Sequence, residues 1–135
     1  MTTLTWNHAR TIGVRAMDDQ HGILMDTLNE LRLALVRGLA RETFHETLGR
    51  FLLFSRQHFE SEERLLQRFG YPGIERHREH HARLLEKVRA SARRIQASEA
   101  PSLQPLLQLL LGWYQEHIET ADRGYGPWLN QRGIY

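Results

Sequence analysis

The chain has 135 residues, of which 41% are hydrophobic and 25% charged, an ordinary composition for one globular domain with a single core. It has no cysteine, which excludes thiolate metal sites, iron–sulfur clusters and disulfide frameworks. The net charge is only +2, and all basic residues except Lys87 are arginines that alternate with glutamates, so nucleic acid is not an expected partner.

Membrane association is not expected either. The longest apolar run, 106–111, is interrupted by Gln108 and falls far short of the roughly 18 residues that a spanning helix needs. The first residues carry neither the basic nor the apolar segment of a signal peptide, so a cytoplasmic location is expected.

Glycine and proline cluster at a few positions, and between them apolar residues recur every three or four positions without strand-like alternation. This pattern predicts an all-α fold, an antiparallel up-down-up-down four-helix bundle, because short connections join long helices. We expect a single domain over residues 1–135, with the bundle at 18–130 and an N-terminal arm at 1–17. The arm carries three apolar residues that should lie across the bundle: Trp6, Ile12 and Val14.

The first helix is expected to begin near Asp18 or Asp19, either of which can cap the exposed N–H groups of its first turn. It should end near Gly38, since glycine is favoured just past a helix end. The residues expected on its inward face are His21, Leu24, Leu28, Leu31 and Leu35.

The other three helices are expected over 42–69, over 73–97 and after Pro101. The second should turn inward Phe44, Leu48, Phe51, Ser55, His58, Glu62, Leu65 and Phe69. The third should turn inward Ile74, His77, His81, Leu84, Val88, Ser91 and Ile95. The fourth should turn inward Leu103, Leu106, Leu110, Trp113 and His117.

Polar side chains interrupt these apolar stripes. A buried unpaired carboxylate costs several kcal/mol, and buried imidazoles need partners too. One such histidine is more often a hydrogen-bonded core residue than a metal ligand, but a set spread over four helices requires a common compensating charge. A metal centre supplies that charge. The set is His21, His58, Glu62, His77, His81 and His117.

The spacing of these residues favours the same interpretation. His58 and Glu62 are four apart, as are His77 and His81, so each pair projects from one helix face about one turn apart. Two ligands on consecutive turns can bind one cation or two adjacent cations. Either pair alone is a weak signal, whereas their combination near the middle of long helices is specific.

A further pair is less regular. His117 and Asp122 are five apart, which corresponds to about 140° around an ideal helix. Both side chains can serve one site only if the helix widens locally, as in a π-bulge, or if the aspartate reaches round from the flank.

The combined residues resemble the hemerythrins, and within them the bacterial single-domain branch, the bacteriohemerythrins. The resemblance covers essentially the whole chain and includes tryptophans near the start and before the last ligand pair. It is carried by Trp6, 18–21, 58–63, Tyr71, Pro72, His77, His81, Trp113, His117, Ile118, Asp122 and Tyr125.

This resemblance implies a non-haem di-iron protein whose two iron ions share an oxo or hydroxo bridge. One iron would have six ligands and the other five, which leaves one position for molecular oxygen. It implies that His77, His81 and His117 hold one iron, that His21 and His58 hold the other, and that Glu62 and Asp122 bridge the two.

The function implied is reversible oxygen binding for storage or delivery. Five neutral imidazoles and only two carboxylates donate less negative charge than carboxylate-rich di-iron oxygenase sites, which favours carrying over oxidising. Two alternatives stay open: a sensor of oxygen, nitric oxide or redox state, and a di-iron oxidase or peroxidase. The last alternative is a structural bundle that holds zinc or no metal. Zinc usually takes four ligands, which seven candidates fit poorly.

One departure from the family pattern concerns the oxygen pocket, to which Trp113 and Tyr114 are expected to contribute. The family usually has leucine where this chain has Tyr114. Two interpretations stay open: the phenol faces the iron and favours autoxidation or peroxide chemistry, or it turns outward into water.

The remaining polar residues near the pattern are assigned no metal. His8, His45 and His80 are expected not to be ligands, and His80 should be exposed because it lies about 100° from the face of His81. For Glu63 we favour a surface position over contact with a ligand. For Gly22 we favour neutral variation over a need for space near the metal.

Overall fold

The fold is described from a computed structural model, which covers residues 12–38, 41–97, 104–118 and 124–135. These residues are predominantly helical and include no strand, so the expected all-α class is confirmed. The helices are α1 (Arg15–Val36), α2 (Arg41–Arg68), α3 (Ile74–Ala97), α4 (Gln104–Glu116) and the short α5 (Gly126–Asn130). No helix in the described segments is long and apolar enough to cross a membrane.

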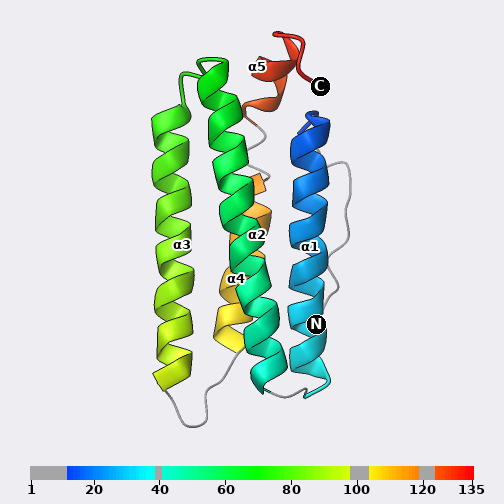
Figure 1. The fold of residues 1–135 in the computed structure, drawn as a ribbon, viewed down its shortest axis with the longest axis vertical. Coiled ribbons are helices and arrows are strands. Elements are labelled where there is room, and N and C mark those ends of the chain that lie inside the picture. The colour runs from blue at the N-terminus through cyan, green and yellow to red at the C-terminus, as the bar shows by residue number, and fades with distance from the viewer. Residues whose placement is uncertain (1–11, 39–40, 98–103, 119–123) are drawn as a thin grey trace.

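The four long helices form the expected antiparallel bundle (Figure 1). Each runs opposite to the helix before it, and α1 packs against both α2 and α4, while α3 packs against the same two helices. Because every long helix has two neighbours, a ring of four inward faces encloses one core. Any side chains on those faces at the same height must meet in the middle.

Glycines end two of the helices where the sequence predicts. Gly70 follows α2 with φ +70°, and the N–H of Tyr71 donates to the carbonyl of Leu66 at 2.9 Å, the hydrogen bond that closes a Schellman turn. Gly38 follows α1 with φ +61°. Both positions favour glycine, because a side chain makes a left-handed backbone unfavourable.

The start of α1 differs from the prediction. The helix begins at Arg15, and Val14 precedes it without a side-chain cap, so neither Asp18 nor Asp19 is the capping residue. Instead the carboxylate of Asp18 accepts hydrogen bonds from the N–H groups of Ile12 at 2.9 Å and Gly13 at 3.3 Å. An acidic residue one turn inside the helix therefore secures the segment that enters it.

Most residues predicted to face inward do so, but each predicted stripe is narrower than the face that its helix buries. Phe59, Leu66 and Leu107 are fully buried although the expected stripes omit them, whereas Leu65 and Phe69 are only half-buried. The reason is that a helix with two neighbours buries an arc wider than one line of side chains. The expectations for Trp6, Leu103, Asp122 and the side chain of Ile95 lie outside the described residues.

The C-terminal helix α5 covers the end of the bundle where α1 begins (Figure 1). Ile12 and Val14 are buried, as expected for the entering segment, and Asn130 of α5 donates a hydrogen bond to the carbonyl of Gly13 at 2.9 Å. Gly126 lies so close to Ile12 that an added Cβ would sit 1.9 Å from the Ile12 carbonyl oxygen. The first and last described segments thus close this end together.

Candidate metal centre

Six of the seven predicted ligands converge in the centre of the bundle. All six side chains are buried, with exposed fractions of 5% or less. They form two groups that share one carboxylate, and the donor atoms within each group all lie within 4.8 Å of one another. The seventh, Asp122, lies outside the described residues. The six residues are His21, His58, Glu62, His77, His81 and His117.

The first group joins α1 and α2. The Nε2 atoms of His21 and His58 lie 3.0 Å apart, and Nε2 of His58 lies 3.2 Å from Oε2 of Glu62. Two nitrogens that bind one ion at right angles, with bonds of about 2.1 Å, lie about 3 Å apart. The spacing of this group therefore fits a common metal ion.

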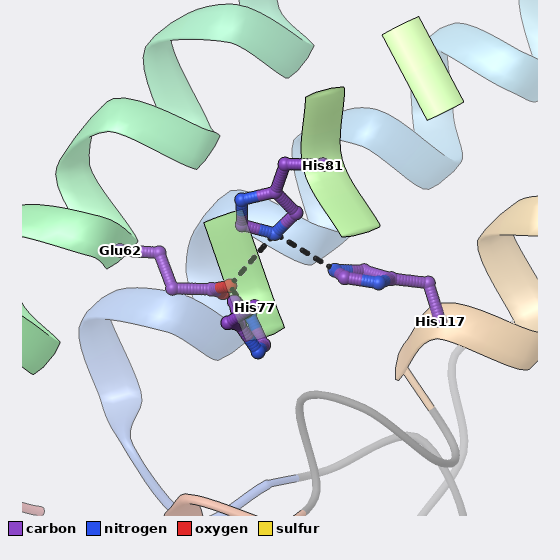
Figure 2. Close-up of side chains that lie close together, drawn as sticks. All are labelled: Glu62, His77, His81 and His117. Atoms are coloured by element: carbon purple, nitrogen blue, oxygen red, sulfur yellow. Dashed lines mark hydrogen bonds and ion pairs between the residues drawn. The ribbon is translucent and has the colours of Figure 1, made fainter. Parts of the chain in front are cut away.

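The second group joins α2, α3 and α4 and is drawn in Figure 2. Nε2 of His81 lies 3.1 Å from Nε2 of His117 and 3.2 Å from Oε1 of Glu62, and Nε2 of His77 contacts the same Oε1 atom. Three imidazoles from two helices and one carboxylate oxygen thus point toward one position. Their separations also fit ligands on adjacent corners of one coordination sphere.

Glu62 divides its two oxygens between the groups. Oε1 faces His77 and His81, whereas Oε2 faces His58 at 3.2 Å and His21 at 3.9 Å. A carboxylate that turns one oxygen to each of two donor groups has the geometry of a bridging ligand. The side chain is completely buried, so water does not compete for either oxygen.

The electrostatics of the cluster favour cation binding at neutral pH. Burial raises the pKa of Glu62, but the charge of His58 and hydrogen bonds from three histidines outweigh burial, so this pKa lies well below its ordinary value. Burial lowers the pKa of His81 to about 4, although Glu62 opposes the shift. At pH 7 the carboxylate is charged and the His81 imidazole is neutral, the forms that bind a metal.

Aromatic rings enclose the second group. Phe59 stacks on His81 with ring centroids 3.8 Å apart and planes inclined by 11°, and Trp113 stacks on His117 at 5.9 Å. Phe59 is not among the residues that helical periodicity predicts to face inward, because it lies beside that stripe on α2. These rings fix the imidazole planes and keep water away from them.

The last histidine lies at an irregular point of its helix. Regular α-helix ends at Glu116, and the next two residues, His117 and Ile118, are π-helical. A π-helical widening is one of the two arrangements that the sequence left open for His117 and Asp122, and Asp122 itself lies outside the described residues. His117 itself reaches the cluster from this turn.

Tyr114 points into the protein, so the interpretation that it turns outward into water is wrong. Its side chain is 1% exposed, and its hydroxyl donates a hydrogen bond to the backbone carbonyl of His21 at 2.5 Å. The phenol therefore links α4 to α1 at the height of the first group. Its oxygen is engaged by the backbone of α1.

Tyr125 also belongs to the site. It is part of the family pattern, but the sequence alone predicts no role for it. It is completely buried just before α5, and its hydroxyl donates a hydrogen bond to Oε2 of Glu62 at 2.7 Å. Tyr125 thereby orients the shared carboxylate from the C-terminal end of the described chain.

Two expectations about neighbouring residues are wrong. His80 is half-buried, and its ring stacks on His117 at 4.9 Å, because the irregular turn of α4 brings His117 beside it. Glu63 is also partly buried, with Oε2 lying 3.6 Å from Nδ1 of His81 and Oε1 lying 3.7 Å from Arg78. Neither side chain is simply a surface residue.

The other two expectations concern His45 and Gly22. His45 packs edge-on against Phe44, and it is not among the donors that cluster in the described part of the chain. An added Cβ at Gly22 would have no neighbouring atom within 4 Å, which agrees with neutral variation. His8 lies outside the described residues.

Comparison with known proteins agrees with this geometry. Residues 12–129 match the family model of the hemerythrin HHE cation-binding domain. The chain is 30% identical over 125 residues to the bacteriohemerythrin of Stenotrophomonas maltophilia, covering 93% of this chain and 80% of that protein. It is 29% identical to that of Methylococcus capsulatus, covering 96% and 99% respectively. The crystal structure of a leucine-to-tyrosine mutant of hemerythrin superposes with a TM-score of 0.85, at 30% identity, over 94% of this chain and 97% of that one.

A buried His/Glu centre inside an antiparallel four-helix bundle defines the class of metal-binding helical bundles. Within that class, the chain belongs to the hemerythrin family. Its cofactor is the di-iron centre that hemerythrin domains bind, and the observed cluster is able to hold the metal ions.

Proposed function

We propose that this chain binds molecular oxygen reversibly, for storage or delivery in the cytoplasm. The observation that carries the proposal is the division of Glu62 between two donor groups, one with two histidines and one with three. Such unequal groups leave one of two ions with fewer protein ligands and therefore with room for an external ligand.

The ligand assignment is part of this proposal. His77, His81 and His117 hold one iron, His21 and His58 hold the other, Glu62 bridges them, and Asp122 is the second bridge. The support is the separation of about 3 Å between paired Nε2 atoms in each group, together with the charged state of Glu62 at neutral pH.

The iron pair supplies reversible binding of oxygen, and nitric oxide is a second small ligand that such a centre accepts. The protein's own residues hold the imidazoles in place and exclude water. Phe59 and Trp113 cover the second group, and Tyr114 closes the side of the first group with its hydroxyl bound to backbone. A dry, apolar surrounding slows the loss of charged products and so favours reversible binding.

The main alternative function is a di-iron oxidase or peroxidase that uses the Tyr114 phenol. That alternative needs a hydroxyl available to the bound ligand, whereas this hydroxyl donates to the carbonyl of His21. A sensor of oxygen, nitric oxide or redox state uses the same centre, and a partner that responds to its state would distinguish a sensor from a carrier.

The test begins with the purified protein. Iron is counted by elemental analysis, the protein is reduced without oxygen, and air is added while the visible spectrum is recorded. The expected result is two irons per chain and a visible band that appears with oxygen and disappears on degassing. Consumption of added reductant without a stable oxygenated form would instead identify an oxidase.

Variants test the ligand assignment separately. Glu62→Ala and His117→Ala should each lower the iron content, because each removes a donor atom from the cluster. His45→Ala is the matched control, since His45 lies on α2 outside the cluster and should leave two irons in place. Full iron content in either ligand variant would contradict the role given to that residue.

A further inference from the structure

The amide of Gln20 lies between two polar side chains of α2. Its Oε1 atom lies 2.6 Å from Nδ1 of His58, and its Nε2 group donates a hydrogen bond to Oγ of Ser61 at 3.2 Å. His58 thus contacts Gln20 with one ring nitrogen, and its other nitrogen faces His21 and Glu62. Gln20 therefore contacts a member of the two-histidine group from outside, on the ring nitrogen that faces away from the other donors.

The chemistry of an amide decides where the His58 proton lies. An amide oxygen only accepts hydrogen bonds, so the imidazole nitrogen that faces it must carry a proton. In this orientation the NH₂ end of the amide donates to Ser61 Oγ at 3.2 Å, while the oxygen end faces the ring. With Nδ1 held protonated by the amide, Nε2, which faces Glu62, is the nitrogen that gives up its proton when a metal binds.

The two donor groups differ in the charge of the side chain that faces an outer ring nitrogen. In the three-histidine group, Nδ1 of His81 lies 3.6 Å from a carboxylate oxygen of Glu63, a charge contact that is too long for a hydrogen bond. In the two-histidine group, Nδ1 of His58 faces a neutral amide at 2.6 Å. A carboxylate withdraws the ring proton more strongly than an amide, which makes the opposite nitrogen a stronger electron donor to a metal.

We propose that Gln20 is a positioning residue for the two-histidine iron: it fixes the proton of His58 on Nδ1 and, as a neutral acceptor, limits the electron donation of this ligand. Limited donation favours the ferrous state, to which an oxygen carrier must return when oxygen leaves. The second part of this proposal rests on the proposed function, whereas the placement of the proton does not.

The surroundings of Gln20 permit a chemical rescue. A cleft of about 280 Å³ between α1 and α2 is lined by Gln20, Ile23, Phe54, Gln57 and His58. Gln57 is exposed, and half of the Ile23 side chain is exposed, so small molecules reach this cleft from solvent. A small amide can therefore enter the space left when the Gln20 side chain is shortened.

The first experiment uses the metal-free protein, in which ¹⁵N NMR reports which ring nitrogen of His58 carries a proton. The expected result is a proton on Nδ1 in the wild type and loss of this preference in Gln20→Leu. Gln57→Leu is the matched control and should behave as wild type, because it changes the same cleft without touching the amide. The proposal would be overturned if Nδ1 carried no proton in the wild type. It would also be overturned if the preference for a proton on Nδ1 were the same in Gln20→Leu as in the wild type.

The second experiment measures ferrous iron affinity by competition with a chelator under anaerobic conditions. Loss of a hydrogen-bonding partner to a ligating histidine typically costs about 10- to 100-fold in metal affinity, which we expect for Gln20→Ala and Gln20→Leu. Acetamide should restore affinity to Gln20→Ala but not to Gln20→Leu, whose side chain fills the space. Equal affinity in all variants would refute the positioning role.

The third measurement is the midpoint potential of the iron-loaded protein. Gln20→Glu should keep the proton on Nδ1, lower the potential and speed autoxidation, because a carboxylate replaces the neutral acceptor. An unchanged potential would remove the electronic part of the proposal. A wild type that takes up no iron would defeat the proposed function, while the NMR result would still decide the placement of the His58 proton.

Discussion

Tyr114 illustrates how a single side chain can stabilise the site without donating to it. Its phenol is buried between α4 and α1 and donates a hydrogen bond to the backbone carbonyl of His21. The contact fixes the distance between two helices that carry ligands of different groups. The aromatic ring also fills space that water would otherwise occupy.

The hydroxyl and the ring of Tyr114 make separable contributions. Tyr114→Phe removes only the hydrogen bond and should lower the free energy of unfolding by about 1 kcal/mol, with autoxidation unchanged. Tyr114→Leu also removes ring volume and should speed autoxidation by admitting water. Urea unfolding of the metal-free protein and the autoxidation rate of the loaded protein measure the two effects. Faster autoxidation in Tyr114→Phe would give the hydroxyl a chemical role.

His81 predicts how the stability of the metal-free protein depends on pH. Its pKa is lowered by burial from 6.5 to about 4, so the folded state holds this imidazole neutral while the unfolded state protonates near pH 6.5. The contribution of the neutral His81 ring to the free energy of unfolding is therefore fully present above pH 6.5. It is lost progressively as the pH falls toward 4, by up to about 3 kcal/mol. His81→Gln should show a smaller loss between pH 7 and pH 4 in urea unfolding, and an equal loss would contradict the assigned shift.

The sequence predicted the clustered residues because their spacing is that of a helix. Imidazoles at steps of three and four on apolar faces must point inward, whatever the exact packing. It did not predict the roles of Gln20, Phe59 and Tyr125. Their contributions depend on contacts between helices, and helical periodicity does not specify which side chains of different helices meet.

At the scale of elements, the position of α5 connects the end of the bundle to its centre. Tyr71 packs edge-on against Trp128 with ring centroids 5.2 Å apart, and the Arg132 guanidinium lies 3.5 Å from the Trp128 ring centroid. The contact with Tyr71 joins α5 to the turn between α2 and α3, and Arg132 covers the Trp128 ring from within the C-terminal segment. Since Tyr125 directly precedes α5, the position of this helix determines where the Tyr125 hydroxyl meets Glu62.

Gly126 should be sensitive to any side chain, because a Cβ there would lie 1.9 Å from the Ile12 carbonyl oxygen. Gly126→Ala should therefore displace α5, lower the free energy of unfolding by roughly 1–3 kcal/mol and reduce the iron content. Gly22→Ala is the control, because an added Cβ at this position meets open space. This substitution should raise the free energy of unfolding by up to about 1 kcal/mol and should leave the iron content unchanged. Urea unfolding and elemental analysis measure both, and an iron loss in Gly22→Ala would show that space near His21 matters.

Helix boundaries were predicted well where glycine fixes them and less well where several polar residues compete. Gly38 and Gly70 adopt the left-handed backbone that ends a helix, a property of the residue itself. Asp18, in contrast, is as suitable for a cap as for its actual contact with Ile12 and Gly13. Only the position of the entering segment decides between these roles, and that position depends on α5.

At the scale of the whole molecule, metal binding and folding are coupled. The two donor groups draw on four helices, so they exist together only in the assembled bundle. Each bound ion therefore stabilises the folded state relative to the unfolded chain. The metal-free bundle must meanwhile keep a charged Glu62 among imidazoles in its interior, a costly arrangement without a cation.

Removal of iron should accordingly lower the unfolding temperature. A ligand present at 100 to 1,000 times its dissociation constant stabilises a protein by about 3–4 kcal/mol, which raises the unfolding temperature of a chain of this length by roughly 10–20 °C. Thermal unfolding with and without chelator measures the difference. In Glu62→Ala the chelator should have little effect, and an equal shift in that variant would place the stabilising metal elsewhere.

The order in which the chain is synthesised gives the hydrogen bond from Tyr125 to Glu62 a further consequence. The ribosome synthesises His21, His58 and Glu62 before α4, whereas His117 and Tyr125 come after it. The two-histidine group can therefore assemble first on a growing chain. The three-histidine group must wait for α4, and the tyrosine that orients the shared carboxylate follows later still.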